Sequence, residues 1–298
     1  MIPRGPELSP AYVEARRVLL DALAALGAQS GALVLAGAQA IYLRTGPDSL
    51  AIAEYTTDGD LAVDPAMLED APVLGDLMEA AGFRLAELQG ATEPGIWRKS
   101  AVIGGIEVQI PIDLIVPAGV APPGGTRGAR LGAHGKRAAR KTVGLEAALI
   151  DNDVMRIDAL DPQDRRSSRL RVAGTAALLV AKTHKLNDRI ESGRKDRVDD
   201  KDASDVVRLM QKSSPQMVGK TLAGLREHPS AGPPTELAIG RFGVLFGGRA
   251  GEGIGMAARA LRGAMPEERV RAICLAYAGK LRSSLKMAST SSRAACGD

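Results

Sequence analysis

The chain has 298 residues, of which 45% are hydrophobic and 25% are charged. These proportions are typical of globular proteins and exclude collagen-like, fibrous and wholly disordered chains. Aromatic residues make up only 3% of the sequence, so we expect no surface of stacked rings of the kind that binds single-stranded nucleic acids. The formal net charge of +4 permits an anionic partner but does not require one.

The sequence predicts a cytoplasmic protein without a membrane partner. Its first ten residues, MIPRGPELSP, contain no apolar signal region. The sequence also contains no run of about 18 apolar residues that could cross a bilayer. Its two cysteines, Cys274 and Cys296, form neither a disulfide framework nor a CxxC zinc motif.

The first half of the chain mixes helical and strand patterns. A first helix is expected to begin at the Ser9-Pro10 cap and to end near Gly27. A Gly-, Pro- and Arg-rich segment, 117–142, predicts a long loop. Between them the expected helices are 38–44 and 65–81, and the expected strands are 31–37, 57–63, 84–88, 96–100 and 106–116.

The second half is predominantly helical. Two short strands, 154–160 and 170–172, are predicted to form a hairpin around a charged turn. The patterns together predict an α/β (α+β) protein, with a mixed sheet and flanking helices in residues 1–145 and a mainly helical domain in residues 146–298. Helices are expected over 175–191, 196–212, 215–227, 233–246 and 267–287.

Three aspartates form a candidate metal site. Asp58 and Asp60 are two residues apart, so they point to the same face if both lie on a strand. Two close carboxylates repel unless a cation lies between them, and Mg²⁺ takes such carboxylates together with substrate phosphates. Asp113 is the candidate third ligand, because a lone carboxylate in its apolar strand would be costly to bury. The alternative is that Asp58-Gly59-Asp60 is a solvated turn.

Two helices of the second half carry a second candidate set. Lys182, Lys185 and Arg189 share one stripe of a helix, and Asp202 and Asp205 share a face of the next. Lys182 directly follows an apolar run, so we expect it to be partly buried, where a fixed positive charge can bind a triphosphate. Asp202 could hold Lys182 or help to activate an acceptor hydroxyl. The alternative is a pair of amphipathic helices with charged outer faces.

The order of these motifs resembles the AbiEii/MenT group of nucleotidyltransferase-like toxins, within the DNA polymerase β-like nucleotidyltransferase superfamily. Gly37-Ala38 stands where the superfamily usually shows Gly-Gly or Gly-Ser, and Thr57-Asp58-x-Asp60 follows it. The group also shows a Lys, five residues, and then Asp or Thr before Arg, followed by an Asp-x-x-Asp helix. The matching residues here are Lys182, Asp188-Arg189, Asp202 and Asp205, and the resemblance covers roughly residues 30–210.

The resemblance implies a metal-dependent enzyme that transfers a nucleotide from a nucleoside triphosphate (NTP) to RNA. In some members of the group the acceptor is the 3′ end of tRNA, and a cognate antitoxin protein restrains the toxin. Catalytic roles are implied for Asp58, Asp60, Asp113, Lys182 and Asp202, with Mg²⁺ held by the first three. Nucleotide-binding roles are implied for Gly37, Ala38, Thr57, Lys185, Arg189 and Asp205.

The segment 126–142 contains six positive charges and no acidic residue. Such a glycine-spaced basic loop can follow a phosphate backbone, and the alternative is a solvated loop. The isolated histidines, His134, His184 and His228, are expected to be packed or solvated and not to act as ligands. We expect RNA to be bound by Arg127, Arg130, Lys136, Arg137, Arg140 and Lys141.

Two other functions stay open at the level of sequence. One is a nucleotidyltransferase that acts on a small molecule such as an antibiotic, and the extended basic segment argues against it. The other is a non-catalytic RNA- or protein-binding module on a degenerate transferase fold. The replacement of the usual glycine-rich pair by Gly37-Ala38 permits that reading, whereas the retained carboxylates argue against it.

Overall fold

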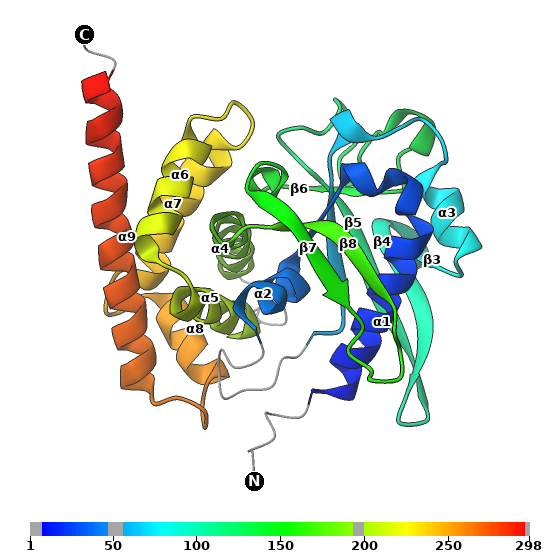
Figure 1. The fold of residues 1–298 in the computed structure, drawn as a ribbon, viewed down its shortest axis with the longest axis horizontal. Helices are drawn as coiled ribbons and strands as arrows, with labels where there is room; N and C mark the ends of the chain where they lie inside the picture. The colour runs from blue at the N-terminus through cyan, green and yellow to red at the C-terminus, as the bar shows by residue number, and fades with distance from the viewer. Residues whose placement is uncertain (1–7, 47–55, 193–199, 296–298) are drawn as a thin grey trace.

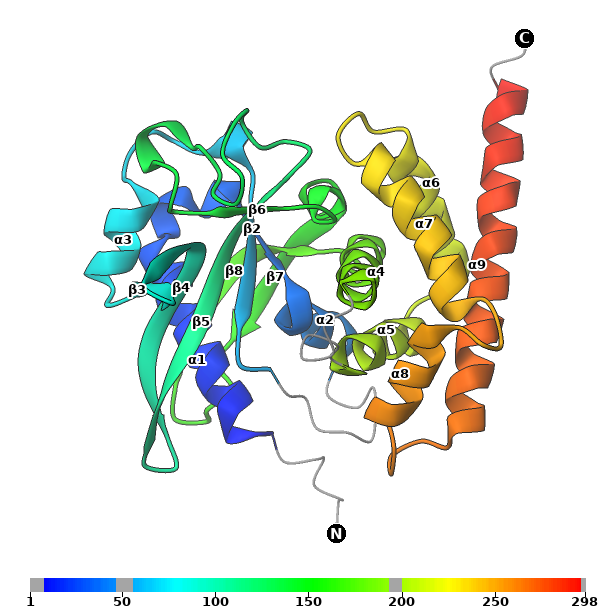
Figure 2. The same ribbon diagram turned by 180° about the vertical axis from the view of Figure 1, so that it is seen from behind.

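The computed structural model describes residues 8–46, 56–192 and 200–295. An eight-stranded mixed sheet with helices on both faces occupies one side of the molecule, and a helical region occupies the other (Figures 1 and 2). The fold class predicted from the sequence is therefore confirmed. No helix in the described ranges is long and apolar enough to cross a membrane.

The central strands of the sheet bring the candidate site together. The strand order is β3-β4-β5-β2-β1-β8-β7, and β6 pairs with β5 outside this path. β1 and β2 are antiparallel, whereas β2 pairs in parallel with β5 and β1 in parallel with β8. The strands are β1 (Leu33–Ala36), β2 (Gly59–Val63), β3 (Arg84–Leu88), β4 (Ala91–Ile103), β5 (Ile106–Pro117), β6 (Arg140–Thr142), β7 (Asn152–Asp158) and β8 (Ser167–Ala173).

Different helices cover the two faces of the sheet. On one face lies α1 (Pro10–Ala25), capped by Ser9, whose Leu19 side chain packs close to Gly59 of β2. On the other lie α2 (Gly37–Thr45) and α4 (Thr175–Glu191) (Figure 1). Because side chains alternate along a strand, Asp60 points away from α1 and toward α2 and α4.

The helix α4 is anchored at its N-terminus by Asp151. A carboxylate oxygen of Asp151 accepts a hydrogen bond from the Ala177 amide (2.9 Å), and a Cβ atom at Gly174 would overlap this carboxylate. Negative charge at this end also interacts favourably with the helix dipole. The direction of α4, and with it the position of Lys182, is therefore fixed against the end of β8.

The remaining helices form the helical region. Among them α5 presents buried apolar residues to α2, α4 and α8, and α9 runs along α6 (Figures 1 and 2). These helices are α5 (Asp200–Lys212), α6 (Pro215–Arg226), α7 (Gly232–Phe246), α8 (Glu252–Ala260) and α9 (Glu267–Ala295).

Most predicted elements are confirmed, with bounds shifted by a few residues. The predicted helix 65–81 is wrong: Asp64 caps a short 3₁₀ turn, Pro65–Met67, and the helix present is the shorter α3 (Leu74–Ala80). Pro72 cannot donate a backbone hydrogen bond inside a helix, so the helix begins only after this residue. The helix α8 was not predicted, and the start of the predicted helix 196–212 lies outside the described residues.

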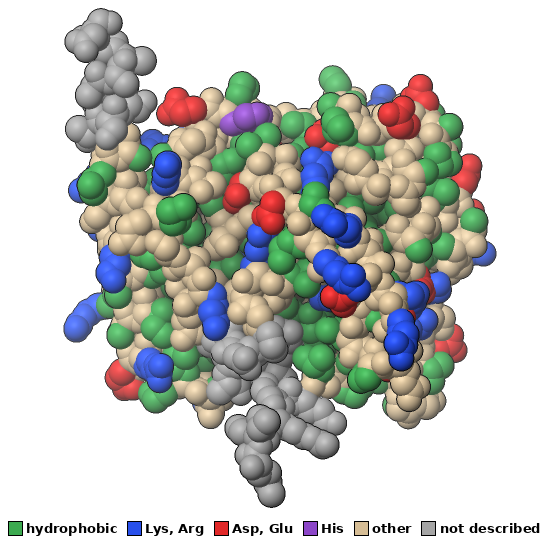
Figure 3. All heavy atoms as spheres, viewed as in Figure 1, with side chains coloured by type: hydrophobic (Ala, Val, Ile, Leu, Met, Phe, Trp, Pro, Cys, Tyr) green, Lys and Arg blue, Asp and Glu red, His purple; other side chains and the backbone are tan. Residues whose placement is uncertain are grey.

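The predicted hairpin is confirmed as β7 and β8, which pair antiparallel and complete the sheet beside β1. Figure 3 shows Lys and Arg side chains gathered along this hairpin. The predicted domain boundary at residues 145–146 falls between β6 and β7, two strands of the same sheet. Continuous helical structure begins only at Thr175.

Candidate active site

Asp60 and Asp113 lie side by side at the centre of the site. The parallel pairing of β2 with β5 places them directly opposite each other, and Ala36, the last residue of β1, opposes Asp60 on the other side. Asp58 lies just before β2, two residues from Asp60. The three aspartates that the sequence predicts to form a site therefore lie close together, on or next to two central strands of the sheet.

Gly37 leaves the space that the Asp60 side chain occupies. It has a φ of 65°, and a Cβ atom there would lie 1.9 Å from a carboxylate oxygen of Asp60. The chain needs both properties of glycine here, because an L side chain disfavours this backbone conformation. The next residue, Ala38, is buried in the first turn of α2.

We expect Gly37→Ala to reduce catalytic activity on the order of 100-fold, because it displaces Asp60 from its place in the site. Gly46, at the other end of α2, has a φ of 72° but open space around it. Gly46→Ala is therefore the matched control for backbone strain. Urea titration should show a loss of about 1–3 kcal/mol of unfolding free energy in Gly46→Ala from backbone strain alone, and a larger loss in Gly37→Ala, whose Cβ atom also overlaps the Asp60 carboxylate. Equal activities of the two variants would contradict the predicted displacement of Asp60.

A buried polar network holds Asp58. Gln39 of α2 donates a hydrogen bond from Nε2 to the Asp58 carbonyl (2.9 Å), and its own oxygen accepts one from Arg16 Nε (2.7 Å). Thr56 donates its hydroxyl to the Asp58 carboxylate (2.5 Å). The sequence analysis did not identify Arg16 and Gln39. Their place among apolar residues of helical segments was the signal that could have indicated a buried polar network.

Asp113 is held by Arg140, which the sequence placed on an RNA-binding loop. Arg140 donates from Nη2 to a carboxylate oxygen of Asp113 (2.7 Å). The strand β6, within the predicted loop, pairs with β5 and brings this arginine into the site. The Nε atom of Arg140 is buried and has no hydrogen-bond partner within the described ranges. Arg140 is thus corrected from a surface position to a residue of the site.

Lys182 stands between two aspartates of the neighbouring helix. Its ammonium group lies 2.5 Å from Asp202 and 2.7 Å from Asp205, and all three side chains are at least 95% buried. Asp202 also pairs with Lys185 (3.4 Å) and with Arg189. The carboxylates raise the pKa of Lys182 against the opposing effect of burial, so this lysine is charged. The contact by which Asp202 could hold Lys182 is therefore present, whereas activation of an acceptor hydroxyl by Asp202 stays a prediction.

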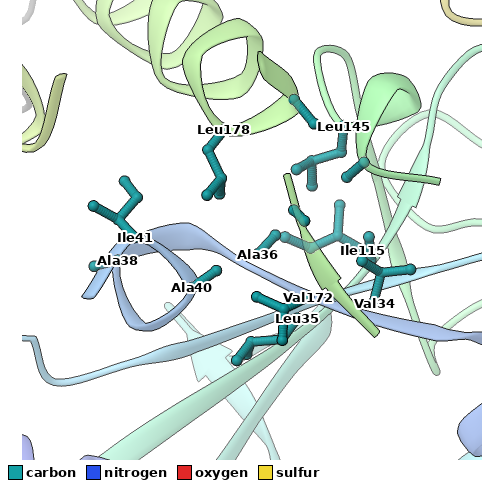
Figure 4. Close-up of a cluster of buried hydrophobic side chains, with 14 of the residues drawn as sticks. Val34, Leu35, Ala36, Ala38, Ala40, Ile41, Ile115, Leu145, Val172 and Leu178 are labelled. Atoms are coloured by element: carbon teal, nitrogen blue, oxygen red, sulfur yellow. The ribbon is translucent and has the colours of Figure 1, made fainter. Parts of the chain in front are cut away.

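Two cavities adjoin Asp60. The larger, about 340 Å³, has an apolar wall that includes Ile115, Leu145 and Leu178, side chains that Figure 4 shows close together. Arg140, Lys182 and Lys185 also line it. The smaller, about 140 Å³, is lined by Ala38, Thr56, Thr57, Asp58, Asp60, Lys182, Lys185, Arg189, Lys201 and Asp202.

The cavities include most predicted nucleotide-binding residues. Gly37 lines the larger, Ala38 and Thr57 line the smaller, and Lys185 and Arg189 line both. Asp205 lines neither cavity and instead accepts a hydrogen bond from the ammonium group of Lys182. Lys201, which sequence reasoning missed, joins the positive side chains of the smaller cavity.

The electrostatics of the three carboxylates differ. Burial raises the pKa of Asp60 to about 6, and the nearby Asp58 and Asp113 add to this shift. Burial also raises the pKa of Asp113, although Arg140 opposes the shift. The pKa of Asp58 is lowered despite burial, because the Thr56 hydrogen bond and the charges of Lys185, Lys201 and Lys182 favour its ionised form. Asp60 is therefore the carboxylate whose ionised form its surroundings favour least.

The donor chemistry of Asp58 and Asp60 fits a hard cation such as Mg²⁺. Carboxylate oxygens are its preferred protein ligands, and it commonly takes one or two of them together with substrate phosphates. Within the described part of the chain, no three carboxylate, histidine or cysteine side chains form a metal-binding group by themselves. Asp113 is engaged with Arg140, so the two carboxylates of the Asp58–Asp60 segment are the better ligands.

Of the other basic residues in the segment 126–142, two contact other parts of the protein and three are exposed to solvent. Arg127 pairs with Glu93 (2.6 Å), and Lys141 donates to the carbonyls of Gly124 and Gly125. Arg130, Lys136 and Arg137 are exposed.

Two of the three histidines serve the packing of the fold. His134 accepts a hydrogen bond from the Leu74 amide, and His184 contacts Pro234 and Arg241. Both are buried, as expected for packed histidines.

Comparisons of the chain with models of protein families, with curated proteins and with solved structures found no match.

Proposed function

We propose that this protein is a nucleotidyltransferase toxin that transfers a nucleotide from an NTP to RNA, with the 3′ end of tRNA as the acceptor. One observation carries the proposal. Asp60 lines a 340 Å³ cavity and lies opposite Asp113 on the neighbouring strand, and Lys182, fixed by two buried aspartates, lines the same cavity. Carboxylates for a cation next to fixed positive charges for phosphate are the requirements of phosphoryl transfer.

The side chains support a division of roles. Lys182, Lys185 and Arg189 would bind the phosphates, and Lys182 is the best placed to stabilise charge because Asp202 and Asp205 fix its position. Mg²⁺, bound by Asp58 and Asp60 together with phosphate oxygens, would neutralise part of the triphosphate charge. Arg140, which lines the larger cavity beside Asp113, adds a further positive charge for an anionic substrate.

The reaction that follows is an in-line displacement. The oxygen of the RNA hydroxyl forms a bond to the α-phosphorus, and the bond from that phosphorus to the bridging oxygen breaks as pyrophosphate leaves. The hydroxyl proton passes to the carboxylate oxygen of Asp113 that Arg140 does not hold. The pKa of Asp113, raised by burial, makes it a stronger base than an exposed aspartate.

The direct test is nucleotide transfer in vitro. The purified protein is incubated with total tRNA, Mg²⁺ and each labelled NTP in turn, beside the Asp60→Ala and Lys182→Ala variants. We expect label in RNA with the unchanged protein and none with either variant. Labelling of a small acceptor but not of RNA would favour the small-molecule enzyme, and no labelling with any NTP would favour a non-catalytic module.

The toxin role has its own test in a bacterial host. Expression of the unchanged protein should arrest growth, whereas the Asp60→Ala variant should not. Rescue by a co-expressed neighbouring gene product would identify the cognate antitoxin. Normal growth with full transfer activity in vitro would contradict the toxin role and retain the enzyme.

A further inference from the structure

The hairpin of β7 and β8 carries a row of arginines on the same face of the sheet as the site. Arg156 and Arg169 lie directly opposite each other, and Arg171 follows Arg169 by two residues. Arg171 is in register with Val34 of β1, which pairs with Ala62, two residues from Asp60. Because partners in register and residues two apart share a face, the row and Asp60 face the same way.

The row has more positive charge than the protein itself neutralises. The side chain of Arg156 is 67% exposed and pairs with Asp158 (2.6 Å), whereas the exposed guanidinium of Arg169 has no partner within the described residues. Arg171 donates to the Gly31 carbonyl (2.6 Å) but pairs with no acid in the same part of the chain. Like charges directly across two strands are unfavourable, so an anionic ligand would stabilise this surface.

We infer that this arginine row, defined by Arg156, Arg169 and Arg171, binds the phosphate backbone of the RNA acceptor. The inference rests on the proposed function and deepens it. Guanidinium groups bind phosphate oxygens in a bidentate manner. On the described strands β7 and β8 the exposed apolar residue of this face is Val154, and these two strands carry none of the aromatic anchors that protein partners usually engage. These features favour a nucleic acid backbone over an acidic protein.

The row is rigidly connected to the site. The strand β8 ends at Ala173 and α4 begins at Thr175, and Arg44 donates to the Ala173 carbonyl (3.0 Å) at this junction. RNA bound along the hairpin is therefore held at a fixed distance from Lys182. This is the property that a surface needs if it is to position one hydroxyl of a large acceptor.

The opposite edge of the sheet offers the natural comparison. Arg84 and Arg98 also oppose each other, on β3 and β4, and face the same way because Ile96 is in register with Asp113. Arg84, however, already donates to two backbone carbonyls, and Glu107 lies on the same face. No third arginine extends this pair on the described strands β3 and β4, so we expect it to bind RNA weakly.

The test measures binding of labelled total tRNA to the full chain without NTP, over a range of salt concentrations. Four variants are compared: Arg156→Glu/Arg169→Glu; Arg156→Gln/Arg169→Gln; Arg84→Glu/Arg98→Glu; and Arg269→Glu/Lys280→Glu, which reverses two exposed charges on α9. At about 0.1 M salt we expect the Arg156→Glu/Arg169→Glu variant to raise Kd at least tenfold and the Arg156→Gln/Arg169→Gln variant to raise it less. The α9 variant should change Kd less than twofold. The salt slope of log Kd should fall by about 1.5 in the first two variants, corresponding to two lost phosphate contacts. Thermal melting confirms that each variant is folded.

Several results would overturn the inference. They are unchanged affinity in both Arg156/Arg169 variants, an equal or larger loss in the Arg84/Arg98 variant, and absence of tRNA binding by the unchanged protein. Competition by polyglutamate as effective as competition by RNA of equal charge would assign the row to an acidic protein instead. Intact tRNA binding without nucleotide transfer would refute the proposed function, but RNA binding by the arginine row would still hold.

Discussion

Asp60→Asn is expected to reduce nucleotide transfer on the order of 10³-fold while making the protein more stable at pH 8. The first effect follows because an amide does not supply the negative charge that would bind the cation, and the cation in turn would neutralise the triphosphate. The second follows because burial and the neighbouring carboxylates raise the pKa of Asp60 to about 6 in the folded chain. Ionised Asp60 therefore lowers the stability of the folded state, and the amide removes that effect.

The sign of this effect on stability depends on pH. Because the pKa of Asp60 in the folded chain exceeds the value of about 4 in an unfolded chain, the folded state binds more protons between these values. The favourable contribution of Asp60 is complete below pH 4 and is lost as the pH rises through about 6. We expect the Asp60→Asn variant to exceed the unchanged protein by about 3 kcal/mol in unfolding free energy at pH 8 and to match it near pH 4.

Urea unfolding at both pH values, together with the tRNA labelling assay, checks both effects. Asp64→Asn is the matched control, because Asp64 follows the same strand but caps an exposed 3₁₀ turn. It should leave transfer unchanged and lose at most about 1 kcal/mol at either pH. An Asp60→Asn variant that is less stable than the unchanged protein at pH 8 would show that ionised Asp60 is well compensated without a cation.

Lys182→Met is expected to abolish transfer and to destabilise the fold by about 3–5 kcal/mol. Removing the lysine leaves Asp205 buried without its cation, while Asp202 keeps Lys185 and Arg189. An uncompensated buried charge has an energetic cost of this size. The double variant Lys182→Met/Asp205→Asn should recover a substantial part of the lost stability, because it removes the stranded charge, yet stay inactive.

Lys185→Met provides the control for this pair. Its side chain is 42% exposed, so its contact with Asp202 contributes at most about 1 kcal/mol to stability, whereas the loss of its charge should raise the KM for the NTP. Urea titrations compare the unchanged protein with Lys182→Met, Asp205→Asn, the double variant and Lys185→Met, and steady-state kinetics are measured for the Lys185 variant. Additive losses in Lys182→Met/Asp205→Asn would indicate that the two residues act independently, contrary to their 2.7 Å contact.

Local patterns predicted the parts of the site that depend on one element or on burial. The apolar periodicity before Lys182 predicted α4 with its observed bounds, and one of the two roles expected for Asp202, holding Lys182, agrees with the observed contact. The cost of burying a lone carboxylate in an apolar strand placed Asp113 beside Asp60.

The contact of Arg140 with Asp113 and the order of the strands could not be read from the sequence. Arg140 reaches Asp113 only because the three residues of β6 pair with β5 inside a segment that has the composition of a loop. Strand pairing of this kind depends on backbone geometry and leaves no periodic signal in three residues. The order of the eight strands was equally hidden, because β8, late in the sequence, lies next to β1.

The place of β8 has a consequence for the protein during its synthesis. β1 is fully buried and lies between β2 and β8, so a growing chain exposes one edge of β1 until more than 100 further residues have left the ribosome. Lys182 and its two aspartates emerge later still. Under the proposed function, a nascent chain therefore cannot act on the tRNAs that serve its own synthesis until Asp202, the last of the proposed catalytic residues, has been translated.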